Sequence, residues 1–262
     1  GAAYAKALAM NRALQPPAVL AETVNLGNLA RLQFRQGGRA EAEAGLRDAM
    51  TRREHVLGAD YRDNGRGYDR AWLADILLAR GRLDEARTVA ADALAEALAV
   101  HPEASPDTAF ALVVDARLAA ASGDWRQAAT RAAQAVAMDE TLADEASERA
   151  IRARLQFGEI LHRLGRDAEA RSQLARALAA ADAQAPAPPA LVGHIAAELA
   201  LVAASLGDAR AAAGLRERAQ AALAAIPAGR NAERDKVVQL LVQGRDIRRI
   251  ATSGSARRPA SG

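Results

Sequence analysis

Five glycines recur along this chain at intervals of 44, 42, 42 and 42 residues. They are Gly37, Gly81, Gly123, Gly165 and Gly207. A fixed period of this length is typical of stacked helical units, each of which buries its apolar face only against its neighbours. The period therefore predicts a repeat array and not a single globular core.

Three columns of small residues keep the same register as the glycines. Seven residues before each glycine stand Ala30, Ala74, Ala116, Gly158 and Ala200. Five and twelve residues after stand Ala42, Ala86, Ala128, Ala170 and Ala212, and Ala49, Ala93, Ala135, Ala177 and Ala219. Small side chains let two helix backbones approach closely, and glycine is the residue that most readily ends a helix in a left-handed conformation. Each unit is therefore expected to be an antiparallel helix pair joined at its glycine.

The remaining expectations about the fold come from irregularities in this pattern. The longest loop is expected from Leu57 through Gly67, where the repeat carries its two-residue insertion. Asp107 follows a proline-containing boundary and is predicted to cap the next helix. Asp115 occupies a column that is apolar in the other four units, so the third pair is expected to pack less regularly.

Composition excludes several classes of function. Only 3% of the residues are aromatic, and 35 basic residues nearly balance 32 acidic ones. Single-stranded nucleic acid needs aromatic stacking platforms and a surface of one charge sign, so no nucleic-acid binding is expected. No apolar run is long enough to cross a bilayer, and membrane insertion is not expected. Because the chain has no cysteine, disulfides and thiolate metal sites are excluded.

No set of residues in the sequence has catalytic or metal-ligand spacing. The histidines His55, His101, His162 and His194 are expected to face solvent, although His162 and His194 can approach each other on neighbouring first helices. The segment Gly65-Arg66-Gly67 lacks the lysine and the serine or threonine of a phosphate loop. The chain itself is therefore predicted to have no catalytic residue, metal or cofactor, and not to be an enzyme.

The period also divides the chain. Residues 1–17 are expected to form the second helix of a truncated repeat, 18–230 five helix-pair repeats, 231–251 a C-terminal capping helix and 252–262 a disordered tail. Strand signals are nearly absent. The predicted fold class is all-α, a right-handed α-solenoid of antiparallel helix pairs.

The turns of two units resemble a known family. Gly165-Arg166-Asp167-Ala168-Glu169-Ala170, with Gly158 before it and Ala177 after it, resembles the tetratricopeptide repeat (TPR), and the segment Gly81–Ala86 matches it equally well. The 42-residue spacing is similar to that of the kinesin-light-chain-like subtype. The resemblance implies a TPR-like superhelix and a protein-binding role. Similar arrays follow the kinase domain of bacterial serine/threonine protein kinases, and others follow DNA-binding domains of bacterial regulators.

In a right-handed stack of such pairs the first helices line the concave wall, and residues six before each glycine point inward. Arginines and Asn28 on this wall are predicted to hold a partner's backbone or carboxylates by charge-assisted hydrogen bonds, with Tyr68 and Phe110 as apolar anchors. The predicted partner-binding residues are Asn28, Arg31, Arg35, Tyr68, Asp75, Phe110, Arg117, Arg152, Glu159 and Arg163.

These expectations together predict a scaffold that binds a peptide or partner protein in its concave groove. It would be the non-catalytic part of a larger regulatory protein. The alternatives are the C-terminal regulatory region of a bacterial serine/threonine protein kinase and the effector-sensing half of a TPR-containing transcriptional regulator. An uncapped repeat end at Ala2 to Leu14 can also support self-association. The expected location is cytoplasmic, with the periplasmic portion of a membrane-anchored protein as the alternative.

Overall fold

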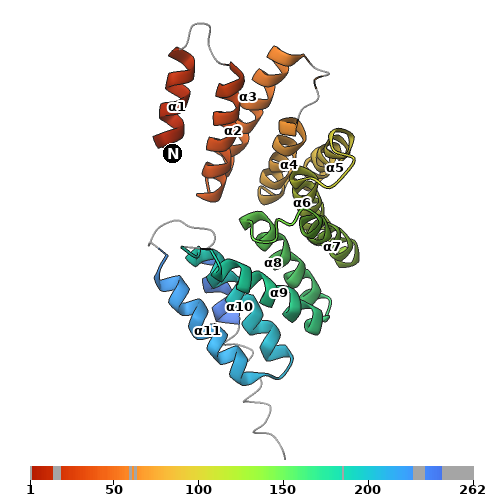
Figure 1. The fold of residues 1–262 in the computed structure, drawn as a ribbon, viewed down its shortest axis with the longest axis vertical. Coiled ribbons are helices and arrows are strands. Elements are labelled where there is room, and N and C mark those ends of the chain that lie inside the picture. Colours follow the sequence, from red (N-terminus) through yellow and green to blue (C-terminus); the bar gives the residue numbers. More distant parts are fainter. Residues whose placement is uncertain are drawn as a thin grey trace, which may run out of the picture. The chain divides into compact units, whose positions relative to one another are not determined.

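The computed structural model describes residues 2–13, 19–58, 61, 64–184, 186–226 and 234–243, and within these ranges the chain is helical with no strand (Figure 1). The helices are α1 (Ala2–Ala13), α2 (Val19–Arg35), α3 (Arg39–Leu57), α4 (Asn64–Ala79), α5 (Leu83–Val100), α6 (Pro106–Ala121), α7 (Trp125–Thr141), α8 (Glu148–Arg163), α9 (Asp167–Asp182), α10 (Pro189–Ser205) and α11 (Ala209–Ala224). Residues 234–243 form a further helix. The all-α prediction is confirmed.

The chain divides into two compact units, Gly1–Glu145 and Ala146–Gly262. In unit 1 the pairs α2–α3, α4–α5 and α6–α7 each pack closely, and α1 packs on α2. In unit 2 the pairs are α8–α9 and α10–α11. The first helices of successive pairs also contact each other within each unit, α2 with α4, α4 with α6, and α8 with α10.

Each periodic glycine ends a first helix as the sequence predicts. All five have positive φ, between 72° at Gly165 and 88° at Gly37. At Gly165 the following amide, that of Arg166, donates to the carbonyl of Leu161 at 2.9 Å, which closes a Schellman turn. The same hydrogen bond follows Gly37, Gly81, Gly123 and Gly207. The turn satisfies carbonyls that the helix end would otherwise leave without a donor.

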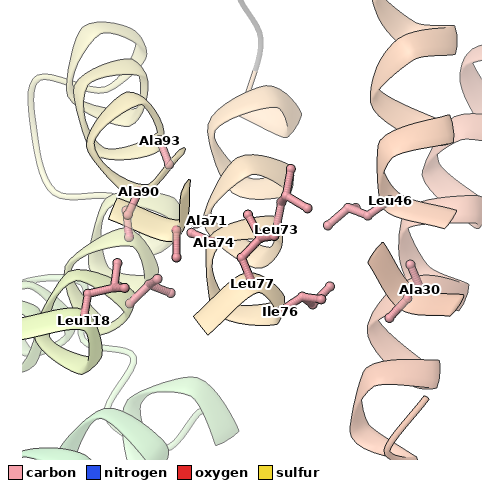
Figure 2. Packing of buried hydrophobic residues seen from close by; sticks show 14 residues of the cluster. Ala30, Leu46, Ala71, Leu73, Ala74, Ile76, Leu77, Ala90, Ala93 and Leu118 are labelled. Carbon is pink, nitrogen blue, oxygen red and sulfur yellow. The ribbon is translucent and has the colours of Figure 1, made fainter. Parts of the chain in front are cut away.

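The columns of small residues lie inside the helix pairs. Every alanine predicted for them is buried, and Ala86 and Ala170 are completely so. Figure 2 shows the arrangement in unit 1, where Leu73, Ile76 and Leu77 of α4 lie between Leu46 of α3 and the alanines of α5. Alanine leaves room for a close approach of the helices, the larger leucine and isoleucine side chains fill the space between them, and burying one such side chain contributes about 1.5–3 kcal/mol.

Unit 2 has a comparable core and continues beyond its last pair. Leu155, Leu174 and Ile195 belong to one buried cluster across α8, α9 and α10. The helix at 234–243 packs on the fifth pair through Val237 and Leu241, which join a second cluster with residues of α10 and α11. The rest of the range predicted for a terminal helix, and the whole predicted tail at 252–262, lies outside the described residues.

Two local predictions are corrected. Ser105 and not Asp107 caps α6, because the Ser105 hydroxyl accepts a hydrogen bond from the Thr108 amide at 3.0 Å. The loop predicted through Gly67 is shorter, because α4 already begins at Asn64. Gly65 and Gly67 therefore lie in the first turn of a helix and not in a phosphate-binding loop.

Asp115 does not interrupt its helix pair. Its carboxylate pairs with Arg131 of α7 at 2.8 Å, so an ion pair replaces the apolar contact made elsewhere in that column.

Candidate functional site

The predicted partner-binding residues of unit 1 come together on the first helices α2, α4 and α6. We call the set of contacting residues on these three helices the first-helix surface. It consists of Asn28, Arg31, Tyr68, Trp72, Asp75, Phe110 and Arg117. Six of these seven residues are half-buried side chains that also reach solvent, which suits recognition groups better than core residues, and Asp75 is buried.

Arg31 is the best-anchored residue of this surface. Its guanidinium donates to Asp69 at 2.9 Å and to the side-chain oxygen of Asn28 at 2.7 Å. It also lies over the Tyr68 ring, with Cζ 5.1 Å from the ring centroid. Asp69 in turn accepts from the buried Arg53 of α3 at 2.9 Å. Arg31 is therefore fixed in place by both charge and stacking, which preorganises it at the surface.

Four of the chain's eight aromatic side chains meet beside Arg31. Trp72 packs against Phe110 with ring centroids 4.8 Å apart, and Tyr68 lies 5.4 Å from Phe110. Phe34 meets Trp72 edge-on at 6.2 Å. The indole N–H of Trp72 is buried and has no hydrogen-bond partner among the described residues. In a chain so poor in aromatics, this cluster gathers half of the rigid aromatic side chains in one region.

Asp75 and Arg117 occupy the same column in successive repeats and form an ion pair across them. Asp75 is buried, whereas the side chain of Arg117 is 41% exposed and keeps donors facing solvent. Arg35 is exposed at the end of α2. Charged residues that were predicted to bind a partner, Asp75 and Arg117, thus also form an ion pair between neighbouring first helices.

The predicted residues of unit 2 behave differently. Arg152 donates to Glu148 of its own helix at 2.9 Å, and Arg163 is exposed at the end of α8. Glu159 of α8 instead reaches α10, where its Oε1 lies 2.7 Å from Nε2 of His194. His162 does not face solvent alone, because its Nδ1 lies 2.6 Å from Asp167.

Glu159 and His194 belong to a polar cluster in unit 2 with Glu198 and Lys236. Glu198 Oε1 lies 4.0 Å from His194 Nε2 and 3.7 Å from Lys236 Nζ. Burial, with the Glu159 carboxylate nearby, raises the pKa of Glu198 to about 7. Burial would also raise the pKa of Glu159, but His194 and Lys236 outweigh it and the pKa lies below its ordinary value. The cluster therefore holds two carboxylates that compete for the same positive charge.

The sequence reasoning missed Trp72 and Asp69 in unit 1, and His194, Glu198 and Lys236 in unit 2. A signal for most of them was present in the period. Counting 42 residues from one repeat to the next, Tyr68, Phe110, Arg152, His194 and Lys236 form one column, and Trp72 and Glu198 share another. Extending the columns of the predicted residues would have found them.

Comparison with known proteins identifies similar folds among solved structures. No protein-family model matches the chain, and no curated protein matches it. Among solved structures, BtubC (BKLC) from P. vanneervenii superposes with a TM-score of 0.68 at 22% identity, over 88% of this chain and 94% of that one. Nearly identical TPR-like repeats of a kinesin light chain protein from Podosopora anserina give a TM-score of 0.57 at 20% identity, over 76% and 93% of the two chains.

These similarities show that the chain has the TPR fold, in the variant found in kinesin-light-chain-like repeats, as the spacing predicted. A Rap protein complexed with Competence and Sporulation Factor also matches, with a TM-score of 0.66 at 15% identity. The match covers 89% of this chain but 60% of the Rap protein. Among the described helices, none is both long and apolar enough to span a membrane.

Proposed function

We propose that this chain is a protein-interaction scaffold, the non-catalytic part of a larger regulatory protein, which binds a peptide or an extended segment of a partner on the first-helix surface of unit 1. The observation that carries the proposal is the contact between Arg31, Tyr68 and Phe110, which come from three successive repeats. A cation, a phenol and an apolar ring lie side by side there, and all three side chains are half-buried and reach solvent, although Phe110 also packs against the core. Aromatic and arginine side chains dominate the binding free energy of protein interfaces.

The contacts also indicate what the partner offers. Arg117 retains exposed donors, so a carboxylate or a backbone carbonyl is the complementary group. The aromatic cluster needs an apolar side chain one or two residues away. A short segment that combines an acidic and an apolar residue fits both. Support from the neighbours is limited to the fold: a Rap protein that shares it was crystallised with a bound factor.

The experiment is selection of binders from a random peptide library on the full chain, followed by affinity measurements with the selected peptides. The key variant is the charge swap Asp75→Arg with Arg117→Asp. It keeps opposite charges facing each other across the two repeats but reverses the charge shown to a partner. A plain Arg31→Glu/Arg117→Glu variant would place each new carboxylate beside Asp69 or Asp75, so lost binding could reflect damage to the fold.

Phe110→Ala provides the second variant, and Arg126→Glu on α7 provides the control, because Arg126 is exposed on a second helix of the same unit. The swap and Phe110→Ala are each expected to weaken binding by roughly tenfold or more, while Arg126→Glu leaves it unchanged. If the selected peptides bind the swap and Phe110→Ala as tightly as the unaltered chain, the first-helix surface is not the binding site.

A further inference from the structure

The polar cluster of unit 2 has the composition of a metal-ion site. His194 and Glu198 stand four residues apart on α10, so one helix face presents an imidazole and a carboxylate in the same direction. Glu159 of α8 faces them from the preceding repeat. One ligand atom from each of the three residues lies within 4.8 Å of the other two.

The spacing of these atoms fits a single ion. Zinc binds imidazole nitrogen and carboxylate oxygen at roughly 2.0–2.2 Å in a tetrahedral arrangement, which places neighbouring ligand atoms about 3.4 Å apart. Nε2 of His194 lies 2.7 Å from Oε1 of Glu159 and 4.0 Å from Oε1 of Glu198. The observed separations lie on either side of the required one. Small rotations about side-chain bonds, without movement of α8 or α10, would equalise them.

Two of the three atoms face each other in the interior of the cluster. Oε1 of Glu159 and Nε2 of His194 are buried, and neither has a hydrogen-bond partner among the described residues. They lie 2.7 Å apart without the alignment of a hydrogen bond. Glu198 is only 6% exposed, and its Oε1 lies 3.7 Å from Lys236 Nζ and 4.0 Å from His194 Nε2, both beyond hydrogen-bond distance. Burying carboxylates costs free energy that a bound cation would partly recover.

We propose that Glu159, His194 and Glu198 bind one divalent transition-metal ion of the Zn²⁺ class, with a fourth position open to water or to a partner's side chain. One imidazole and two carboxylates favour zinc over calcium or magnesium, which take six or more oxygen ligands. The side chains of His194 and Glu159 are 17% and 28% exposed, so an ion can enter from solvent. The ion would join the first helices of the last two repeats.

Lys236 is the group that takes the place of the ion when no metal is bound. Its ammonium lies 3.7 Å from Glu198, on the helix at 234–243 that packs against the fifth pair. An ammonium so close to a ligand opposes a second cation by charge repulsion. Lys236→Met is therefore expected to tighten metal binding severalfold. A cluster that serves only as an ion-pair network would instead gain no metal affinity from this change.

The experiment is isothermal titration of the untagged full chain, stripped with a chelator, with Zn²⁺, and absorption spectroscopy with Co²⁺ as a zinc substitute. One ion per chain is expected, with the intense visible bands of a four-coordinate cobalt site. His194→Gln and Glu198→Gln should each weaken binding by about tenfold or more, because loss of even an outer-shell partner costs 10–100-fold. The matched control is His101→Gln, since His101 lies in unit 1, outside the cluster.

Folding of each variant is checked by circular dichroism. If either α10 variant misfolds, Glu159→Gln, on a half-buried side chain of α8, takes its place. The proposal is wrong if the stripped chain binds no Zn²⁺. It is equally wrong if the cluster variants bind as tightly as His101→Gln, since the ion would then bind elsewhere. Neither outcome bears on the first-helix surface of unit 1.

Discussion

Replacing Gly158 with alanine tests whether close approach of two helix backbones determines the register of the repeats. Gly158 is the one glycine in the small column before the turns, where the other four units have alanine. A Cβ added there would lie 2.5 Å from Cγ and 2.7 Å from Cδ2 of Leu174 on α9. Carbon atoms in favourable contact are about 3.5–4.0 Å apart, so roughly 1 Å of separation is missing. Leu174 is completely buried.

Two effects of opposite sign contribute to the result. Alanine is better than glycine in a helix interior by about 1 kcal/mol, whereas overpacking a closely packed core costs about 1–3 kcal/mol. The matched control is Gly214→Ala in α11 of the same unit, because a Cβ there has no neighbour within 4 Å. The gain in helix propensity is common to both variants and cancels in their difference. Gly158→Ala should therefore be less stable than Gly214→Ala by about 1–3 kcal/mol.

The assay is urea unfolding followed by circular dichroism at a helix wavelength. Both tryptophans, Trp72 and Trp125, lie in unit 1, so tryptophan fluorescence reports that unit and circular dichroism reports both. Gly214→Ala is expected to be slightly more stable than the unaltered chain. If Gly158→Ala gains the same stability as Gly214→Ala, the pair α8–α9 tolerates a wider separation and the steric account of this column fails.

The other predictions concern charge. Asp69→Asn is expected to destabilise unit 1 by about 3 kcal/mol, because it leaves Arg31 and the buried Arg53 without their shared carboxylate. Asp84→Asn, at a side chain that is 98% exposed, should stay within about 0.5 kcal/mol of the unaltered chain in the same urea titration. The pKa of Glu198 rises from 4.5 to about 7 on folding, so its contribution to stability is complete below pH 4.5 and is lost as the pH rises to 7. In chelator-containing buffer this loss should be about 3 kcal/mol, and in Glu198→Gln it should be absent; an equal pH slope in both proteins would contradict the assignment.

The parts of the fold that could be predicted from the sequence are those with a local physical cause. A positive φ requires glycine, and a close approach of backbones requires a small side chain, so both leave a mark at every repeat. The end of α7 shows the limit of this reasoning. Ala143 has a φ of 52° there. Its segment contains neither glycine nor proline, so the sequence does not predict the turn that precedes unit 2. Local backbone hydrogen bonds close this turn, from the Ala143 amide to the Glu140 carbonyl at 3.1 Å and from the Asp144 amide to the Asp139 carbonyl at 3.2 Å.

The candidate site was less predictable because its contacts join different repeats. The sequence placed Arg31 and Tyr68 on one wall, but it did not show that Arg31 pairs with Asp69 and stacks on Tyr68. Which side chains meet depends on the rotation of one first helix against the next. Arg31 reaches Asp69, whereas Arg117 reaches Asp75, six residues further along the same helix. A column of charges therefore does not reveal which members neutralise each other.

The two sites also explain why the sequence of a single repeat contains no binding or metal-ligand motif. Arg31, Tyr68 and Trp72 in unit 1 occupy the same three columns as Glu159, His194 and Glu198 in unit 2, with the first residue of each set one repeat before the other two. The core restricts the alanine columns to small side chains, whereas these three columns carry side chains of varied size and polarity, among them the buried Val114 and Leu201. The same backbone position can therefore carry an aromatic cluster in one place and metal-ligand chemistry in another. Because each site combines residues of successive repeats, it becomes visible only when the helices are packed together.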